Sequence, residues 1–193
     1  MSDFIVLVLL LALSAFFSGA ETALVSLSKG RADGLARENR RGAKALYALK
    51  SEPQRMLIAI LIGNNLVNIG AAALSTVIAT RFLGNFGPGL AVGMLTILIL
   101  VFGEITPKSL STRYSERISL VVAPAVLGFL RAVGPAVTVF QKITDALGNA
   151  ASDGVEDPLV TESELISMIN YGEEEGTIEE SERELIERAF AFT

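Results

Sequence analysis

Oxygen-bearing side chains recur inside the apolar segments of this sequence, at spacings that place them on common helix faces. Ser14 and Ser18 are four residues apart in one apolar run, and Asn64 and Asn68 are four residues apart in a second. A third run ends in VFGEITPKS, residues 101–109, which contains Glu104. Because residues four apart in a helix share a face, each run can present its oxygen atoms in one direction. Hard cations prefer such ligands.

The third run adds a backbone oxygen to this set. Pro107 has no N–H, so the carbonyl of Gly103, four residues earlier, loses its helical donor. Glycine also permits a local break or a π-type turn. Together with the serines, the asparagines and Glu104, this carbonyl makes an all-oxygen set that suits Mg²⁺ or Ca²⁺, with Na⁺ as a third option. The alternatives are helix packing for the serines and asparagines, and a proline kink with Glu104 paired to Lys108, although a lysine there should reach the cytoplasmic interface.

The composition narrows the chemistry further. The 193 residues contain no cysteine and no histidine. Thiolate metal sites and a histidine general base are therefore excluded. An intramembrane hydrolase is disfavoured as well, because Glu21 and Glu104 form no recognisable catalytic dyad. We expect no enzymatic activity and no nucleic-acid partner.

Three long apolar segments must position these residues, at about 4–28, 56–80 and 89–110. Each exceeds the roughly 20 residues that cross a bilayer, so we predict an all-α membrane protein rather than a soluble protein with three buried helices. Residues 29–55 carry eight Lys and Arg residues. By the positive-inside rule this loop is cytoplasmic, which puts the N-terminus outside and the C-terminus inside a multi-pass protein of the cell membrane.

The remaining segments are predicted to be helical as well. Residues 29–55 and 118–147 should form interfacial helices, since Pro124, Gly128 and Gly134 interrupt the second segment. A fourth crossing is the alternative for 118–147. We assign residues 1–148 to a transmembrane domain and 149–193 to a cytoplasmic acidic linker. The net charge is +6 over residues 1–150 and −11 over 151–193.

The acidic linker is predicted to form a helical hairpin. Its first arm opens at Thr161, with Glu164 at the spacing of a capping box, and its second arm covers residues 178–190. Acidic runs usually form a solvated charged face. The functional alternative is a sensor whose clustered carboxylates respond to Mg²⁺.

Three motifs in order resemble the transmembrane domain of the CorC/cyclin M (CNNM) family of magnesium transporters. These are FFSGAETALVSLS, LIGNNLVNI and VFGEITPKSL. The stretch TESELISMINYGEEEGTIEESERELIERAF is similar to the acidic helical linker that precedes a pair of CBS domains in that family. The resemblance implies a homodimer in the bilayer that exports Mg²⁺, with Na⁺ as the candidate exchange ion. It implies a Mg²⁺ site at Ser14, Ser18, Asn64, Asn68, Gly103 and Glu104, with Glu21 less firmly placed because eukaryotic relatives often lack an acid there.

Two further expectations concern regulation and alternative functions. The sequence ends at AFAFT, where the CBS pair would begin, so we expect a truncated chain in which ATP, which acts through those domains, has no site. One alternative function is a Na⁺- or H⁺-coupled carrier of another substrate, with Glu104 and Glu21 as the ion sites. The other is a membrane regulator that senses Mg²⁺ without transporting it.

Overall fold

The computed structural model describes residues 2–84, 87–151, 166–167, 169–170, 173 and 179–190. The chain divides into two compact units, Met1–Leu147 and Gly148–Thr193, and each is described by itself. Within the described residues, the regular secondary structure is helical throughout.

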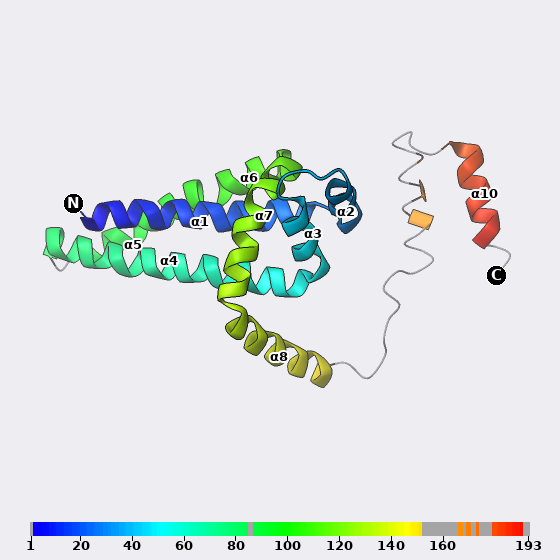
Figure 1. The fold of residues 1–193 in the computed structure, drawn as a ribbon. Coiled ribbons are helices and arrows are strands. Elements are labelled where there is room, and N and C mark those ends of the chain that lie inside the picture. Colours follow the sequence, from blue (N-terminus) through cyan, green and yellow to red (C-terminus); the bar gives the residue numbers. More distant parts are fainter. Residues whose placement is uncertain are drawn as a thin grey trace. The chain divides into compact units, whose positions relative to one another are not determined.

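Three helical segments of the first unit have the length and hydropathy of membrane spans. They cover Ser2–Ser26, Pro53–Phe82 and Ala91–Arg113. The first is α1 (Ser2–Ser26) and the second lies in α4 (Pro53–Leu83). The third joins α5 (Gly87–Leu98), the π-helix η2 (Ile99–Ile105) and α6 (Thr106–Arg113). In Figure 1, α1 and α4 run side by side with α5 and α6 behind them. The predicted all-α membrane fold with three spans is therefore confirmed.

Local sequence signals set the ends of these spans, and they differ from the predicted ends by a few residues. α1 stops at Ser26 because Ser28 caps the next helix, its hydroxyl accepting a hydrogen bond from the amide of Arg31 at 3.2 Å. α4 begins at Pro53, since proline is favoured in the first helical turn. α4 then continues to Leu83 and ends at Gly84, whose φ is +59°. Residues 81–83 and 87–88, between the second and third predicted spans, are thus helical.

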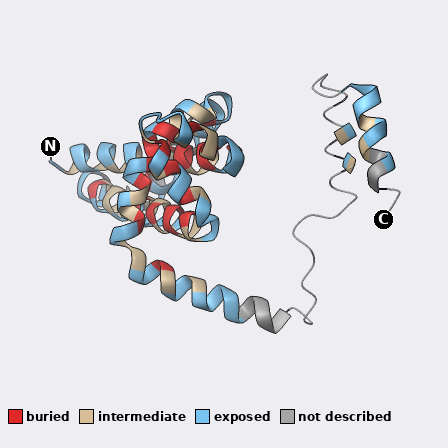
Figure 2. Ribbon diagram, turned by 45° about the vertical axis from the view of Figure 1, so that its right-hand side comes forward, coloured by how far each residue is buried: buried red, intermediate tan, exposed pale blue. Residues whose placement is uncertain are grey.

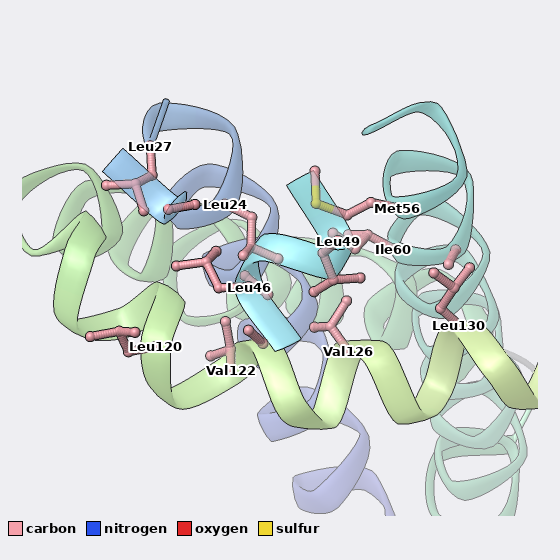
Figure 3. Packing of buried hydrophobic residues seen from close by; sticks show 14 of the residues in the cluster. Leu24, Leu27, Leu46, Leu49, Met56, Ile60, Leu120, Val122, Val126 and Leu130 are labelled. Atoms are coloured by element: carbon pink, nitrogen blue, oxygen red, sulfur yellow. The ribbon is translucent and has the colours of Figure 1, made fainter. Parts of the chain in front are cut away.

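A layer of shorter helices packs at one end of the spans. It consists of α2 (Lys29–Arg37), α3 (Ala43–Ser51) and α7 (Ser115–Ala132). Figure 1 shows α7 crossing α1 and α4, and α7 contacts α1, α3 and α4. Most buried residues gather where these helices meet (Figure 2). Their side chains interdigitate in Figure 3, among them Leu24, Leu46, Leu49, Met56, Ile60, Val122 and Val126. This layer holds the C-terminal end of α1 and the N-terminal end of α4 together.

One glycine allows α3 and α7 to touch through their backbones. Gly42, at the start of α3, has a φ of +85°. A Cβ atom on Gly42 would overlap the carbonyl oxygen of Leu120 in α7. Pro124, inside α7, has no N–H to donate to that carbonyl four residues earlier. The α7 carbonyl that lacks its helical donor is therefore the one that Gly42 approaches.

Two basic side chains also tie the layer together. The Arg31 guanidinium in α2 binds the Glu116 carboxylate in α7, with Nη2 and Nε at 2.8 and 2.9 Å from Oε2. The hydrogen bond and the charge of Glu116 raise the pKa of Arg31 above its usual value. Lys50 in α3 donates from Nζ to the carbonyl of Leu24 at 2.9 Å, in the last turn of α1. Burial lowers the pKa of this ammonium. Lys50 therefore satisfies a carbonyl that has no partner within its own helix.

The segment predicted as an interfacial pair forms α7 and α8 (Gly134–Ala151). The helices meet at Val133 with a bend of 80° between Ser115–Ala132 and Gly134–Ala146. The chain stays helical through Pro124 and Gly128, which were expected to interrupt it. Length and composition would also allow the bent pair to be a broken fourth span, so its interfacial placement remains a prediction.

In the second unit, α10 (Glu180–Phe190) lies within the predicted second arm of the hairpin. The Glu182 carboxylate accepts from the amide of Glu179 at 3.0 Å, which caps the start of this helix. Arg183 pairs with Glu173 at 2.8 Å. The capping box predicted at Thr161 and Glu164 lies outside the described residues.

Candidate cation site

Two serines of α1 point their hydroxyls into the packed interior instead of back to their own helix. Nine other Ser and Thr side chains on the helices of the first unit, including Ser26, Thr76 and Thr96, donate to the carbonyl four residues earlier. This is the ordinary behaviour of these residues in helices. Ser14 and Ser18 are fully buried, and neither Oγ has a hydrogen-bond partner. Both hydroxyls therefore remain available to a ligand.

The asparagines of α4 divide in the same way. Asn65 is exposed and donates from Nδ2 to the carbonyl of Leu61 at 2.9 Å. Asn64 and Asn68 are half-buried, and the Oδ1 atom of each is buried without a hydrogen-bond partner. An unpaired buried amide oxygen is unfavourable by about 1–3 kcal/mol, and both of these oxygens are open to a ligand on one helix face.

The third span contributes a π-helix at the GEITP motif. η2 covers Ile99–Ile105, and the amide of Thr106 donates to the carbonyl of Val101, five residues earlier. The predicted π-type turn is present, and the helix continues without a break through Pro107 into α6. Pro107 can donate neither to Gly103 in the α pattern nor to Phe102 in the π pattern. The motif therefore leaves backbone carbonyls without a hydrogen-bond donor at the point where the helix changes from the π pattern back to the α pattern.

Contacts between the spans place these polar groups at a similar position along the helix axes, which we call the polar level. A Cβ on Gly63 would overlap the ring of Phe17, and a Cβ on Gly70 would lie 3.8 Å from Leu10. From one pair to the other the residue number rises by seven on α4 and falls by seven on α1, as in a single antiparallel register. In this register Ser14 lies opposite residue 66, which is between Asn64 and Asn68. Gly103 is buried, and a Cβ there would lie 2.9 Å from Ser14 Oγ. Ser14 therefore lies at the level where α1, α4 and η2 present their free oxygen atoms.

The two acidic residues of the predicted site behave differently. Glu104 is half-buried and has no hydrogen bond or ion pair within the described part of the chain. Glu21 pairs with Lys108 at 3.6 Å between Oε2 and Nζ. Lys108, considered above as a partner of Glu104, is therefore directed to Glu21. Across the described ranges no three Asp, Glu, His or Cys residues cluster as a metal site, so any cation here would be held by neutral oxygens and one carboxylate.

A methyl group at Gly103 should test this arrangement. Gly103→Ala would place its Cβ 2.9 Å from Ser14 Oγ. A serine hydroxyl can rotate away, so we expect the protein to fold, but with the Ser14 oxygen displaced from the site. We expect Mg²⁺ affinity measured by calorimetry to fall at least about tenfold, the effect of losing one polar contact to a charged group. Gly93→Ala, on the same span with open space around it, should leave the affinity unchanged.

The fold and this polar level define a multi-pass helical membrane protein with a buried, oxygen-lined site. The cyclin M transmembrane N-terminal domain matches residues 5–182 of the chain, so the chain belongs to the cyclin M (CNNM) family of membrane proteins, which is associated with Mg²⁺ transport.

Curated relatives agree with this assignment. The chain is 41% identical over 144 residues to a UPF0053 protein of Haemophilus influenzae, covering 75% of this chain and 34% of the relative. It is 41% identical over 107 residues to the UPF0053 inner membrane protein YfjD of Escherichia coli, covering 55% and 25%. A chloroplastic DUF21 domain-containing protein of Arabidopsis thaliana is 39% identical over 187 residues, covering 95% and 28%. The chain thus spans about a quarter to a third of these relatives' lengths.

Sequence reasoning missed two features near the site. Ser111 in α6 is buried, with 2% of its surface exposed. Its burial is not predicted by the spacing of polar residues in the third span. The pairing of Lys108 with Glu21 was missed because the two residues are 87 positions apart and only the packing of α6 against α1 brings them together.

Proposed function

We propose that this chain carries Mg²⁺ across the membrane, binding it between α1, α4 and η2. The observation that supports this most directly is the set of four buried side-chain oxygens without a hydrogen-bond partner, on Ser14, Ser18, Asn64 and Asn68. A divalent cation would satisfy all of them at once, and Mg²⁺ needs about six oxygens at ~2.1 Å. The Glu104 carboxylate and the Gly103 carbonyl would supply the remaining ligands, and the carboxylate would balance part of the charge.

Each residue has a distinct part in this proposal. The serine and asparagine oxygens replace water around a largely dehydrated ion, and Glu104 supplies the attraction that compensates for dehydration. The π-helix and Pro107 give the third span a point of weak backbone hydrogen bonding. We propose that α6 tilts there to expose the site alternately to the two sides, which fits the family's association with transport.

Glu104→Ala should abolish Mg²⁺ flux in this account. Glu104 is the one acid of the predicted set with no ion pair in the described residues, so no other charge would replace it. The measurement is Mg²⁺ uptake or release in vesicles reconstituted with the purified chain, using a Mg²⁺-sensitive dye. Glu116→Ala, which changes an acid in the layer of shorter helices, is the matched control and should retain flux.

The same vesicles separate the competing functions. Unchanged flux in Glu104→Ala would remove the central residue from the proposal. Mg²⁺ binding by calorimetry without any flux would favour a non-transporting sensor, and binding of Na⁺ without Mg²⁺ would favour a coupled carrier of another substrate.

We further propose a homodimer in the membrane with the N-terminus outside and the C-terminus in the cytoplasm. The basic composition of residues 29–55 supports this orientation by the positive-inside rule, and the family resemblance supports the dimer. Export of Mg²⁺, with Na⁺ as exchange ion, belongs to the same proposal.

A further inference from the structure

The inner end of the proposed site is closed by an ion pair between two of the spans. Glu21 follows Ser18 by one helical turn, and Lys108 follows Glu104 by one turn, so both lie on the faces that carry the site residues. Their charged atoms are 3.6 Å apart. α1 and the third span run in the same direction, so this pair lies next along the path from the polar level toward the basic residues of α2.

The α1 backbone at Gly19 packs against side chains of α6 beside this pair. A Cβ on Gly19 would lie 3.0 Å from Ser111 Oγ and 3.5 Å from Pro107 Cβ. Gly19 and Ser111 are both buried. An ion leaving Ser18 in this direction would therefore meet packed helices, and it could pass between α1 and α6 only if α6 moved.

The contact is weak enough to open. The distance of 3.6 Å is long for an ion pair, and no hydrogen bond joins the two side chains. The Lys108 and Glu21 side chains are 45% and 28% exposed, so neither is locked in place by surrounding protein atoms. α6 also begins directly after η2, where the helical hydrogen-bond pattern changes. A small tilt of α6 would separate Lys108 from Glu21.

We propose that Glu21 and Lys108 form the inner gate of the cation site, an inference that rests on the proposed transport function. With the gate closed, the Lys108 ammonium neutralises Glu21 and repels cations from the inner end of the site. When α6 moves away, the freed Glu21 carboxylate and the Ser111 hydroxyl bind a divalent cation in passing, between the polar level and the cytoplasm. Glu21 is then a transient ligand rather than part of the resting site.

A single engineered thiol can test this gate, because the chain has no cysteine of its own. In Ser18→Cys, the rate of modification by a water-soluble methanethiosulfonate applied from the cytoplasmic side reports how often the gate opens. Adding Lys108→Gln should raise this rate about fivefold, which corresponds to a loss of about 1 kcal/mol from the closed state. The exchanged pair Glu21→Lys with Lys108→Glu should restore the slow rate. Lys44→Gln, an exposed lysine in α3, should not alter it.

The outcomes distinguish the gate from the function on which it rests. A rate unchanged by Lys108→Gln overturns the gate even if the cysteine-free chain binds and transports Mg²⁺. A chain that binds no Mg²⁺ overturns the proposed function even if the thiol becomes accessible. Should Ser18→Cys fail to fold, the Mg²⁺ dissociation rate of Lys108→Gln in the serine background serves instead. The gate predicts a similar acceleration, and an unchanged dissociation rate contradicts it.

Discussion

Replacing Asn68 by alanine should lower the affinity for Mg²⁺ by about ten- to a hundredfold. The Asn68 amide oxygen is buried and unpartnered, at the level of Ser14 and Gly103. A polar contact to a charged group contributes about 1.5–3 kcal/mol, and 1.4 kcal/mol corresponds to a factor of ten in affinity. The combined change Asn64→Ala with Asn68→Ala should leave no binding that calorimetry can detect at millimolar Mg²⁺.

The same substitution should leave the folded state intact, which separates a ligand from a structural residue. Removing a buried oxygen that has no partner removes its desolvation cost, which offsets the packing lost when the side chain is shortened. We therefore expect the Mg²⁺-free melting temperature of Asn68→Ala to equal or exceed that of the unchanged protein. Asn65→Ala is the matched control, since Asn65 is exposed and bonds its own helix, and it should keep full affinity. A drop in melting temperature without loss of affinity would instead identify Asn68 as a structural contact between helices.

Gly42→Ala should have the largest effect on stability, lowering the free energy of unfolding by about 3 kcal/mol or more. Two penalties combine at this position. An L-residue with positive φ is disfavoured by roughly 1–2 kcal/mol, and Gly42 has a φ of +85°. In addition, its Cβ would overlap the Leu120 carbonyl oxygen, and because that atom is backbone, α7 itself would have to move. Overpacking of this kind adds about 1–3 kcal/mol.

Two other glycines separate these penalties. Gly84 has a φ of +59° with open space around it, so Gly84→Ala should show the conformational penalty alone. Gly34 lies within α2 with nothing close to its Cβ position, so Gly34→Ala should be neutral or stabilising by up to about 1 kcal/mol. Chemical denaturation in detergent, followed by helical circular dichroism, measures all three. Equal effects of Gly42→Ala and Gly84→Ala would show that α3 and α7 do not pack as described.

The membrane fold could be read from the sequence because its signals are local. Apolar length defined the three spans, and four-residue spacing placed Ser14 with Ser18 and Asn64 with Asn68 on common faces. The missing N–H of Pro107, four residues after Gly103, indicated where the third helix would depart from the α pattern, and η2 lies there. These inferences depend only on neighbours within one or two helical turns.

Features that depend on contacts between helices could not be predicted in this way. The register of α1 against α4 is set by Phe17 fitting over Gly63, and no periodicity in either helix encodes that match. The close approach of α3 to α7 depends on Gly42, and the partner of Lys108 depends on how α6 packs on α1. Pro124 was expected to interrupt a helix that in fact continues through it, and the Leu120 carbonyl that it frees lies against Gly42 of α3, far away in the sequence.

A map of bound metal tests the central claim most directly. Mn²⁺ prefers oxygen ligands as Mg²⁺ does and gives an anomalous signal in a crystal of the protein grown with that ion. The account predicts one strong anomalous peak between α1, α4 and η2, within about 2.5 Å of oxygen atoms of Ser14, Ser18, Asn64, Asn68 and Glu104, and absent in Asn64→Ala with Asn68→Ala. A peak confined to the carboxylates of residues 148–193, with none at this level of the spans, would contradict it.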